Sequence, residues 1–217
     1  PLGAFGFSGL IIRPFFNRCS EWAGYVSVGA ITASLVLSLW ILSRVVRDGQ
    51  LQLSAHSWLA VGEFELTIGV IMDPLMAVML VVVTGVSLMV QIFSMGYMRG
   101  DRGYARYYAY MSLFTSSMLG LVMASNIIQL FVFWELVGLC SYLLIGFWYH
   151  RPAAVAAAKK AFIVTRLGDF GLLLAILYLF SNGDMFRSAG LDPLAISDIN
   201  MAAGPEMGLL KGGMAMW

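Results

Sequence analysis

A long run of residues with a single charge constrains what this chain can fold into. From Tyr107 to Tyr149, 43 residues contain one formally charged side chain, Glu135. As one helix the run would be about 65 Å long, whereas the hydrocarbon core of a bilayer is about 30 Å thick. The run therefore predicts two membrane crossings, with a turn at the polar pair Ser125-Asn126. Glu135 then lies about nine residues into the second crossing, residues 127–149, near the middle of the membrane.

The whole chain has the composition of a membrane protein. It is 60% hydrophobic and 12% charged, with a mean hydropathy of +0.83, whereas a soluble domain is about 25% charged. Cys19 and Cys140 are too far apart for a CxxC metal site, and His56 and His150 lack the spacing of metal ligands. The net charge of +1 and the lack of a Gly-rich phosphate loop exclude no partner by themselves, but they favour neither nucleic acid nor a nucleotide.

The predicted fold class is all-α, a polytopic transmembrane helix bundle with four complete and two partial membrane helices. Five apolar ranges are candidates for the complete helices, residues 25–43, 73–94, 106–125, 127–149 and 158–181. The partial helices are residues 1–12, ending near Pro14, and the segment that starts at 214, so we expect a piece of a longer protein. Asp73 and Pro74 are an acidic cap and a proline at the first helical position. Alternation in residues 63–70 suggests a short hairpin outside the membrane.

We interpret residues 1–217 as a single membrane domain with three parts. Residues 1–72 form N-terminal helices and an outer loop, residues 73–181 the core helices, and residues 182–217 a polar outer loop with the start of the next helix.

The loop charges predict how the bundle is oriented. Alternate loops carry eight basic residues against two acids, and the remaining loops carry four basic residues against eight acids. Short basic loops stay on the cytoplasmic side of a membrane or its topological equivalent. The basic loops include Arg99, Arg102, Arg106 and Arg151, so we expect these on the cytoplasmic side and residues 182–208 on the other side.

Three charges remain inside apolar helices, namely Glu135, Arg166 and Asp169. Each costs several kcal/mol in a membrane unless it is paired, hydrated or neutralised. Arg166 precedes Asp169 by three residues, so the two share a helix face, with Thr165 one turn before Asp169. One interpretation is that the pair couples this chain to neighbouring chains or lines a proton path. The alternative is that the pair only locks helix packing.

Glu135 has no basic residue within its own helix, and we interpret it as a proton relay, or alternatively as a protonated packing group. Gly138 and Tyr142 share its helix face, and the small Gly138 would let a neighbouring helix or water come close. Lys159 and Lys160 are interpreted as cytoplasmic anchors, with the inner exit of a proton path as the alternative.

Three long strings carry a resemblance to a known family. They are VFWELVGLCSYLLIGFW at 132–148, KAFIVTRLGDFG at 160–171 and GYMRGDRGYARYYAY at 96–110. They resemble the large antiporter-like subunit 5 of respiratory complex I, also called the NDH-1 family. We expect the match to run from Asp73 to Phe180, with residues 1–72 alike only in hydropathy, so residues 73–181 would be the antiporter-like core.

The resemblance implies a proton-translocating subunit at the far end of the membrane arm of an NADH:quinone oxidoreductase. Such a subunit performs no redox chemistry and binds no cofactor. NADH or ferredoxin, FMN, iron–sulfur clusters and quinone belong elsewhere in the complex. Its partners are other membrane-arm subunits, the lipid bilayer and the transported proton. The glutamate matched by Glu135 works in the family with a lysine on a broken helix seven, which lies beyond this sequence.

Two other functions remain open from the sequence. One is a subunit of a multisubunit sodium/proton antiporter, in which the Arg166 to Asp169 stretch is usually neutral, so both charges favour the complex I type. The other is a membrane scaffold that transports nothing. We expect an integral membrane protein, in the bacterial cytoplasmic membrane or alternatively in a thylakoid or mitochondrial inner membrane.

Overall fold

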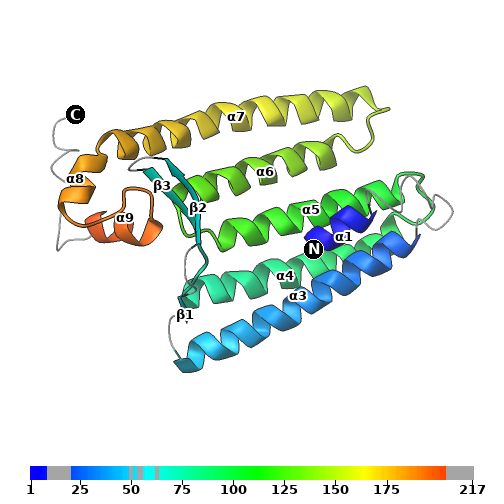
Figure 1. Ribbon diagram of the computed structural model, residues 1–217. Coiled ribbons are helices and arrows are strands. Elements are labelled where there is room, and N and C mark those ends of the chain that lie inside the picture. Colours follow the sequence, from blue (N-terminus) through cyan, green and yellow to red (C-terminus); the bar gives the residue numbers. More distant parts are fainter. Residues whose placement is uncertain (9–20, 49–50, 53–55, 62–63, 204–217) are drawn as a thin grey trace.

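Long helices that run up and down beside one another form the body of the protein (Figure 1). The computed structural model describes residues 1–8, 21–48, 51–52, 56–61 and 64–203. Within these residues the helices are α1 (Leu2–Gly6), α3 (Glu21–Asp48), α4 (Pro74–Tyr97), α5 (Tyr104–Val122), α6 (Ile127–Ile145), α7 (Pro152–Ser181), α8 (Gly183–Ser188) and α9 (Ile196–Ala203).

The five predicted helical ranges correspond in order to α3, α4, α5, α6 and α7. Among the described residues, four helical segments are long and apolar enough to cross a membrane, namely Trp22–Arg47, Pro74–Tyr97, Ile127–Ile145 and Pro152–Ser181. This number agrees with the four complete membrane helices that we predicted, although the sequence offered five candidate ranges for them. The remaining long helix, α5, has 19 residues, more than half of them buried against α1, α3, α4 and α6. Because neighbouring helices cover it, α5 tolerates more polar residues than a helix that faces lipid.

Two of the predicted helix starts are fixed by side-chain caps. The Asp73 carboxylate accepts a hydrogen bond from the Met76 backbone N–H at 2.7 Å, and Pro74 is the first residue of α4. The Asn126 side chain accepts from the Gln129 backbone N–H at 2.6 Å at the start of α6. The predicted turn at Ser125-Asn126 is therefore confirmed.

The helix α7 differs from its prediction, because it begins at Pro152 and has 30 residues. Lys159 and Lys160, which lie at the very start of the predicted range, are exposed and about two turns inside this helix. The run AAVAAA that precedes them has high helix propensity, so the helix starts well before the apolar segment.

Short strands and helices cover one end of the bundle. β2 (His56–Val61) and β3 (Phe64–Ile68) form an antiparallel hairpin, and β1 (Leu51–Gln52) pairs with β4 (Ile71–Met72). The structure therefore has a hairpin in this region, but the predicted stretch 63–70 supplies only its second strand. The predicted polar loop at 182–208 instead contains α8 and α9. This segment is tied to the α5–α6 turn, because Ile127 N–H donates to the Leu194 carbonyl at 2.9 Å and Ile196 N–H donates to the Ser125 carbonyl at 3.1 Å.

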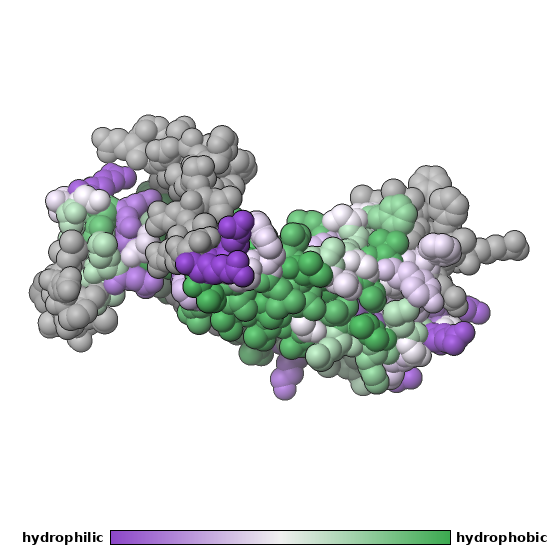
Figure 2. All heavy atoms as spheres, turned by 90° about the horizontal axis from the view of Figure 1, so that it is seen from below, coloured by the Kyte–Doolittle hydropathy of each residue, from purple (hydrophilic) through white to green (hydrophobic). Residues whose placement is uncertain are grey.

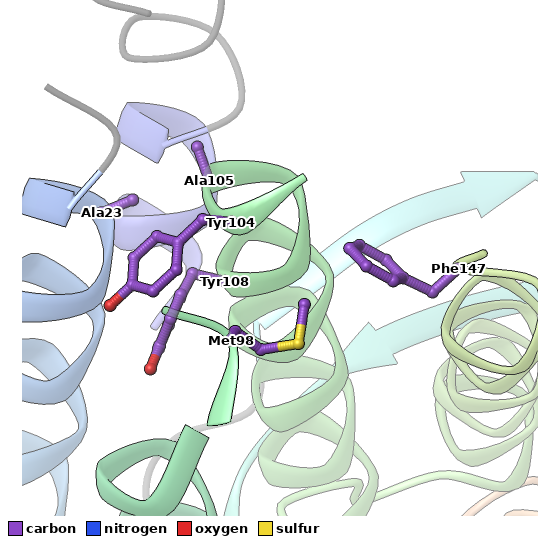
Figure 3. Packing of buried hydrophobic residues seen from close by; sticks show 6 residues of the cluster. All are labelled: Ala23, Met98, Tyr104, Ala105, Tyr108 and Phe147. Atoms are coloured by element: carbon purple, nitrogen blue, oxygen red, sulfur yellow. The ribbon is translucent and has the colours of Figure 1, made fainter. Parts of the chain in front are cut away.

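The opposite end holds the α4–α5 and α6–α7 loops, which carry basic residues. Arg106 Nη2 donates to the Phe147 carbonyl at 3.1 Å, and Trp148 Nε1 donates to an Asp101 oxygen at 3.2 Å, so the two loops lie against each other. A buried cluster lies at this end (Figure 3), formed by Ala23, Met98, Tyr104, Ala105, Tyr108 and Phe147. The basic and acidic loops thus lie at opposite ends, as the charge alternation predicts.

The side of the bundle has the surface of a membrane protein. Figure 2 shows hydrophobic residues over its middle, with most hydrophilic residues toward the two ends. On the long helices, large side chains such as Met89, Phe93, Leu167 and Phe170 are more than half exposed. The protein is therefore an integral membrane protein whose apolar belt faces lipid or further membrane helices.

Candidate functional site

The three intramembrane charges meet between α6 and α7. Arg166 of α7 forms an ion pair with the Glu135 carboxylate of α6, and Arg166 Nη2 also donates to the Glu135 backbone carbonyl at 3.0 Å. Glu135 therefore has a cationic partner on the neighbouring helix, although none lies within its own helix. Spacing within a single helix gave no sign of this contact, because it depends on how α6 and α7 pack.

Asp169 is the second carboxylate of the site. Its Oδ2 lies 3.8 Å from Arg166 Nη1, as expected for residues three apart on one helix. Its Oδ1 accepts a hydrogen bond from Trp134 Nε1 of α6 at 2.7 Å. Both carboxylates are thus held by α6–α7 contacts, and the role of Trp134 could not be predicted because tryptophan is common in membrane helices for other reasons.

Gly138 explains how the guanidinium comes so close to α6. A Cβ atom at this position would lie 3.0 Å from Arg166 Nη2, which is tighter than ordinary van der Waals contact. The expected close approach at Gly138 is therefore made by Arg166. The guanidinium also packs on the Phe162 ring, with Cζ 4.8 Å from the ring centroid, and Phe162 in turn contacts Tyr142 at a centroid distance of 5.3 Å. Arg166 is held in place by both contacts.

Thr165 is not a direct partner of the charges. Its hydroxyl donates to the Ala161 and Phe162 carbonyls of its own helix, at 3.0 and 2.9 Å. Lys159 and Lys160 have no ion pair with the site among the described residues. In the same part of the chain no group of three or more His, Cys, Asp or Glu side chains could hold a metal ion.

The site lies on a face of the bundle that this chain leaves partly open. The side chains of Glu135, Arg166 and Asp169 are 28%, 27% and 12% exposed. A groove of about 460 Å³ runs beside Asp169, lined by Trp134, Val137, Gly138, Ser141, Thr165, Gly168, Asp169 and Leu172. In a membrane such a charged face must be covered by water or by further protein, because lipid cannot solvate it.

The charges of the site do not balance. Two carboxyl groups share one guanidinium, which is always charged. When both carboxyls are ionised, one negative charge has no counterpart within the site. Balance requires one proton on a carboxyl, or one additional cation.

Comparison with known families gives two matches along the chain. Residues 58–108 match the family model described as NADH-Ubiquinone oxidoreductase (complex I), chain 5 N-terminus. Residues 124–215 match the model described as NADH:quinone oxidoreductase/Mrp antiporter, TM. The similarity starts before Asp73 and continues past Phe180, so the expected limits of the resemblance were too narrow.

Curated relatives agree with these matches. The chain is 51% identical over 155 residues to the chloroplastic NAD(P)H-quinone oxidoreductase subunit 5 of Zygnema circumcarinatum, covering 71% of this chain and 22% of that protein. It is 51% identical over 164 residues to NAD(P)H-quinone oxidoreductase chain 5 of Synechocystis sp., covering 76% of this chain and 24% of that protein. The chain thus spans about a quarter of the length of these relatives.

Two solved structures show the same fold. A chain of the Mrp complex from Dietzia sp. has a TM-score of 0.64 and 29% identity, covering 87% of this chain and 19% of that chain. A chain of the membrane-bound sulfane sulfur reductase, an archaeal respiratory membrane complex, has a TM-score of 0.71 and 17% identity, covering 88% and 38%. Both belong to multisubunit membrane assemblies, and the second supports the fold alone.

Proposed function

Because this chain belongs to the antiporter-like subunit 5 family of complex I-type NAD(P)H:quinone oxidoreductases, we propose that it translocates protons as part of a membrane arm. In this proposal Glu135 is a proton relay, and Arg166 and Asp169 couple it to the rest of the complex. The supporting observation is the shared guanidinium between two carboxylates of α6 and α7.

The charge imbalance supplies the chemistry of the relay. A proton that arrives at Glu135 neutralises its carboxylate and weakens its attraction for Arg166, which remains close to Asp169. Departure of that proton restores the ion pair with Arg166. Because Arg166 contacts both carboxylates, a change of charge on one alters the forces on the other. The cluster can therefore link proton uptake to a small movement between α6 and α7.

A second cation that moves toward and away from Glu135 would control proton release and uptake at this site. The family to which the chain belongs is expected to place a lysine on the helix that follows, and the groove beside Asp169 lies on the open face of α6 and α7. An ammonium group that approaches Glu135 supplies the missing positive charge and favours release of its proton. When the ammonium group moves away, the carboxyl takes up a proton again.

The remaining parts of the machinery belong to other subunits in this proposal. NADH or ferredoxin, FMN, iron–sulfur clusters and quinone are bound elsewhere in the complex, and the chain contacts neighbouring membrane-arm subunits and lipid. The relatives named above come from a cyanobacterium and a chloroplast. Quinone reduction would then be coupled to proton transfer through the buried carboxylates of this chain.

Co-purification of the full-length protein tests this assignment. A tag on the protein should retain peripheral flavin and iron–sulfur proteins together with quinone reductase activity. That activity should acidify or alkalise the lumen of sealed vesicles, and an uncoupler should abolish the change. Isolation of the protein without any redox subunit would contradict the complex I assignment.

A subunit of a sodium/proton antiporter is the second candidate. The Mrp-complex structure, at 29% identity, and the shared family model for residues 124–215 favour it. Both curated relatives described above are quinone oxidoreductase subunits, at 51% identity, which favours the first candidate. Retention of small antiporter subunits in the same purification, with sodium-dependent proton exchange, would support the second one.

A further inference from the structure

A polar stripe runs along α4, far from the charged site on α6 and α7. Thr84, Ser87, Gln91 and Ser94 are spaced by three, four and three residues, so they lie on one face of the helix. Thr84, Gln91 and Ser94 are 0%, 0% and 3% exposed. Ten residues of helix correspond to about 15 Å, so the stripe reaches from near the basic end of the bundle to the middle of α4.

The antiparallel helix α5 presents polar groups to this stripe. The Ser87 hydroxyl is 2.6 Å from that of Thr115, and the Ser94 hydroxyl is 2.9 Å from that of Tyr107. Between these two contacts, the Tyr108 hydroxyl donates to the Gln91 backbone carbonyl at 2.9 Å. The α4–α5 interface is therefore polar over three successive turns.

The side-chain amide of Gln91 is the exception in this interface. Its Nε2 and Oε1 atoms are both buried, and neither has a protein partner among the described residues. Rotating the amide so that Nε2 and Oε1 exchange places would not create a hydrogen bond by itself, because both positions lack a partner. A buried amide that makes no hydrogen bond destabilises the fold, and native proteins rarely keep one.

The neighbouring hydroxyls have protein acceptors of their own. Thr84 donates to the Leu80 carbonyl at 2.7 Å and Ser94 to the Val90 carbonyl at 2.7 Å. A hydroxyl oxygen that donates in this way still has lone pairs that can accept from another donor. The polar stripe on α4 thus carries hydroxyl oxygens that can accept a further hydrogen bond.

We propose that the Gln91 amide binds buried water, which joins the polar groups of α4 and α5 into one hydrated lane. A buried water makes about three hydrogen bonds, and here the amide supplies both a donor and an acceptor. Along α4, Gln91 lies between the Ser94–Tyr107 contact and the Ser87–Thr115 contact. The hydrated region lies between the basic end of the bundle and the middle of α4, away from Glu135.

A high-resolution cryo-EM map of the intact complex that contains the full-length protein tests this proposal. We expect density for at least one ordered water within hydrogen-bond distance of the Gln91 amide. Gln91→Leu should remove that density, because leucine offers neither a donor nor an acceptor. Ser38→Ala is the matched control, since Ser38 is 4% exposed but its hydroxyl already donates to the Ser34 carbonyl at 2.8 Å. Its removal should leave the water in place.

Two results would overturn the proposal. One is a wild-type map in which the Gln91 amide bonds only to protein groups or lies in dry surroundings. The other is water density that persists unchanged in Gln91→Leu. The wild-type map gives an answer even if the variant does not assemble. The proposal also does not rest on proton transfer by Glu135, so either idea can fail without the other.

Discussion

Removing the cation of the charged site should destabilise the protein, and a second substitution should partly restore its stability. In Arg166→Gln the two carboxylates of Glu135 and Asp169 lose their shared partner. At the 3.8 Å that separates Arg166 from Asp169, the lost attraction is about 4 kcal/mol at an effective dielectric constant of about 20. Loss of one partner of a buried pair costs about 3–5 kcal/mol.

Partial exposure reduces this cost. Arg166 and Glu135 are 27% and 28% exposed, so we expect the lower end of that range, about 3 kcal/mol. Combining Arg166→Gln with Glu135→Gln removes one of the two stranded negative charges. The double variant should therefore recover part of the loss, although each substitution alone is unfavourable.

The measurement is the amount of protein incorporated into the purified complex, and the temperature at which half of it is lost on heating. Arg166→Gln should lower both values, the double variant should lie between it and the wild type, and the exposed-residue control Arg102→Gln should match the wild type. A double variant that is as defective as Arg166→Gln, or more so, would refute the charge-balance reasoning.

Three further predictions concern Asp169, the contact between α5 and α6, and the orientation of the bundle. Asp169→Asn keeps a hydrogen-bond acceptor but loses the attraction to Arg166 at 3.8 Å, so complex yield or coupled turnover should fall; wild-type values of both would exclude a role for its charge. Gly120→Ala should cost about 1–3 kcal/mol by overpacking, because a Cβ atom there overlaps the Phe133 ring, and it should lower the melting temperature of the complex. In sealed vesicles, Arg102→Cys should react with an impermeant thiol reagent only from the cytoplasmic side; labelling from the outer face alone would reverse the topology.

The helices could be predicted largely because the sequence marks their ends. The starts of α4 and α6 are set by local capping residues, Asp73 before Pro74 and Asn126 before Ile127. Both helices begin where predicted. The start of α7 could not be predicted from hydropathy, because alanines between Arg151 and Lys159 extend a helix without adding to an apolar segment. The two short helices at 183–203 were missed because helices of six and eight residues are too short to give a membrane signal.

The candidate site could be predicted in its members but not in its contacts. A charge inside an apolar helix is visible in the sequence, so Glu135, Arg166 and Asp169 were all found. The pairing of Arg166 with Glu135 depends on the rotation and spacing of α6 and α7, which no single helix encodes. Trp134 shows the same limit, because its hydrogen bond to Asp169 exists only once the two helices pack.

Proton transport by the intact complex with Glu135→Gln tests the central claim most directly. The amide keeps the shape and the hydrogen-bonding capacity of the carboxyl but cannot ionise. With the complex reconstituted into vesicles, we expect Glu135→Gln to lower quinone-coupled electron transfer and proton pumping together, and Glu135→Asp to retain part of both. An unchanged rate and an unchanged number of protons per electron in Glu135→Gln would contradict the account and leave Glu135 as a packing residue.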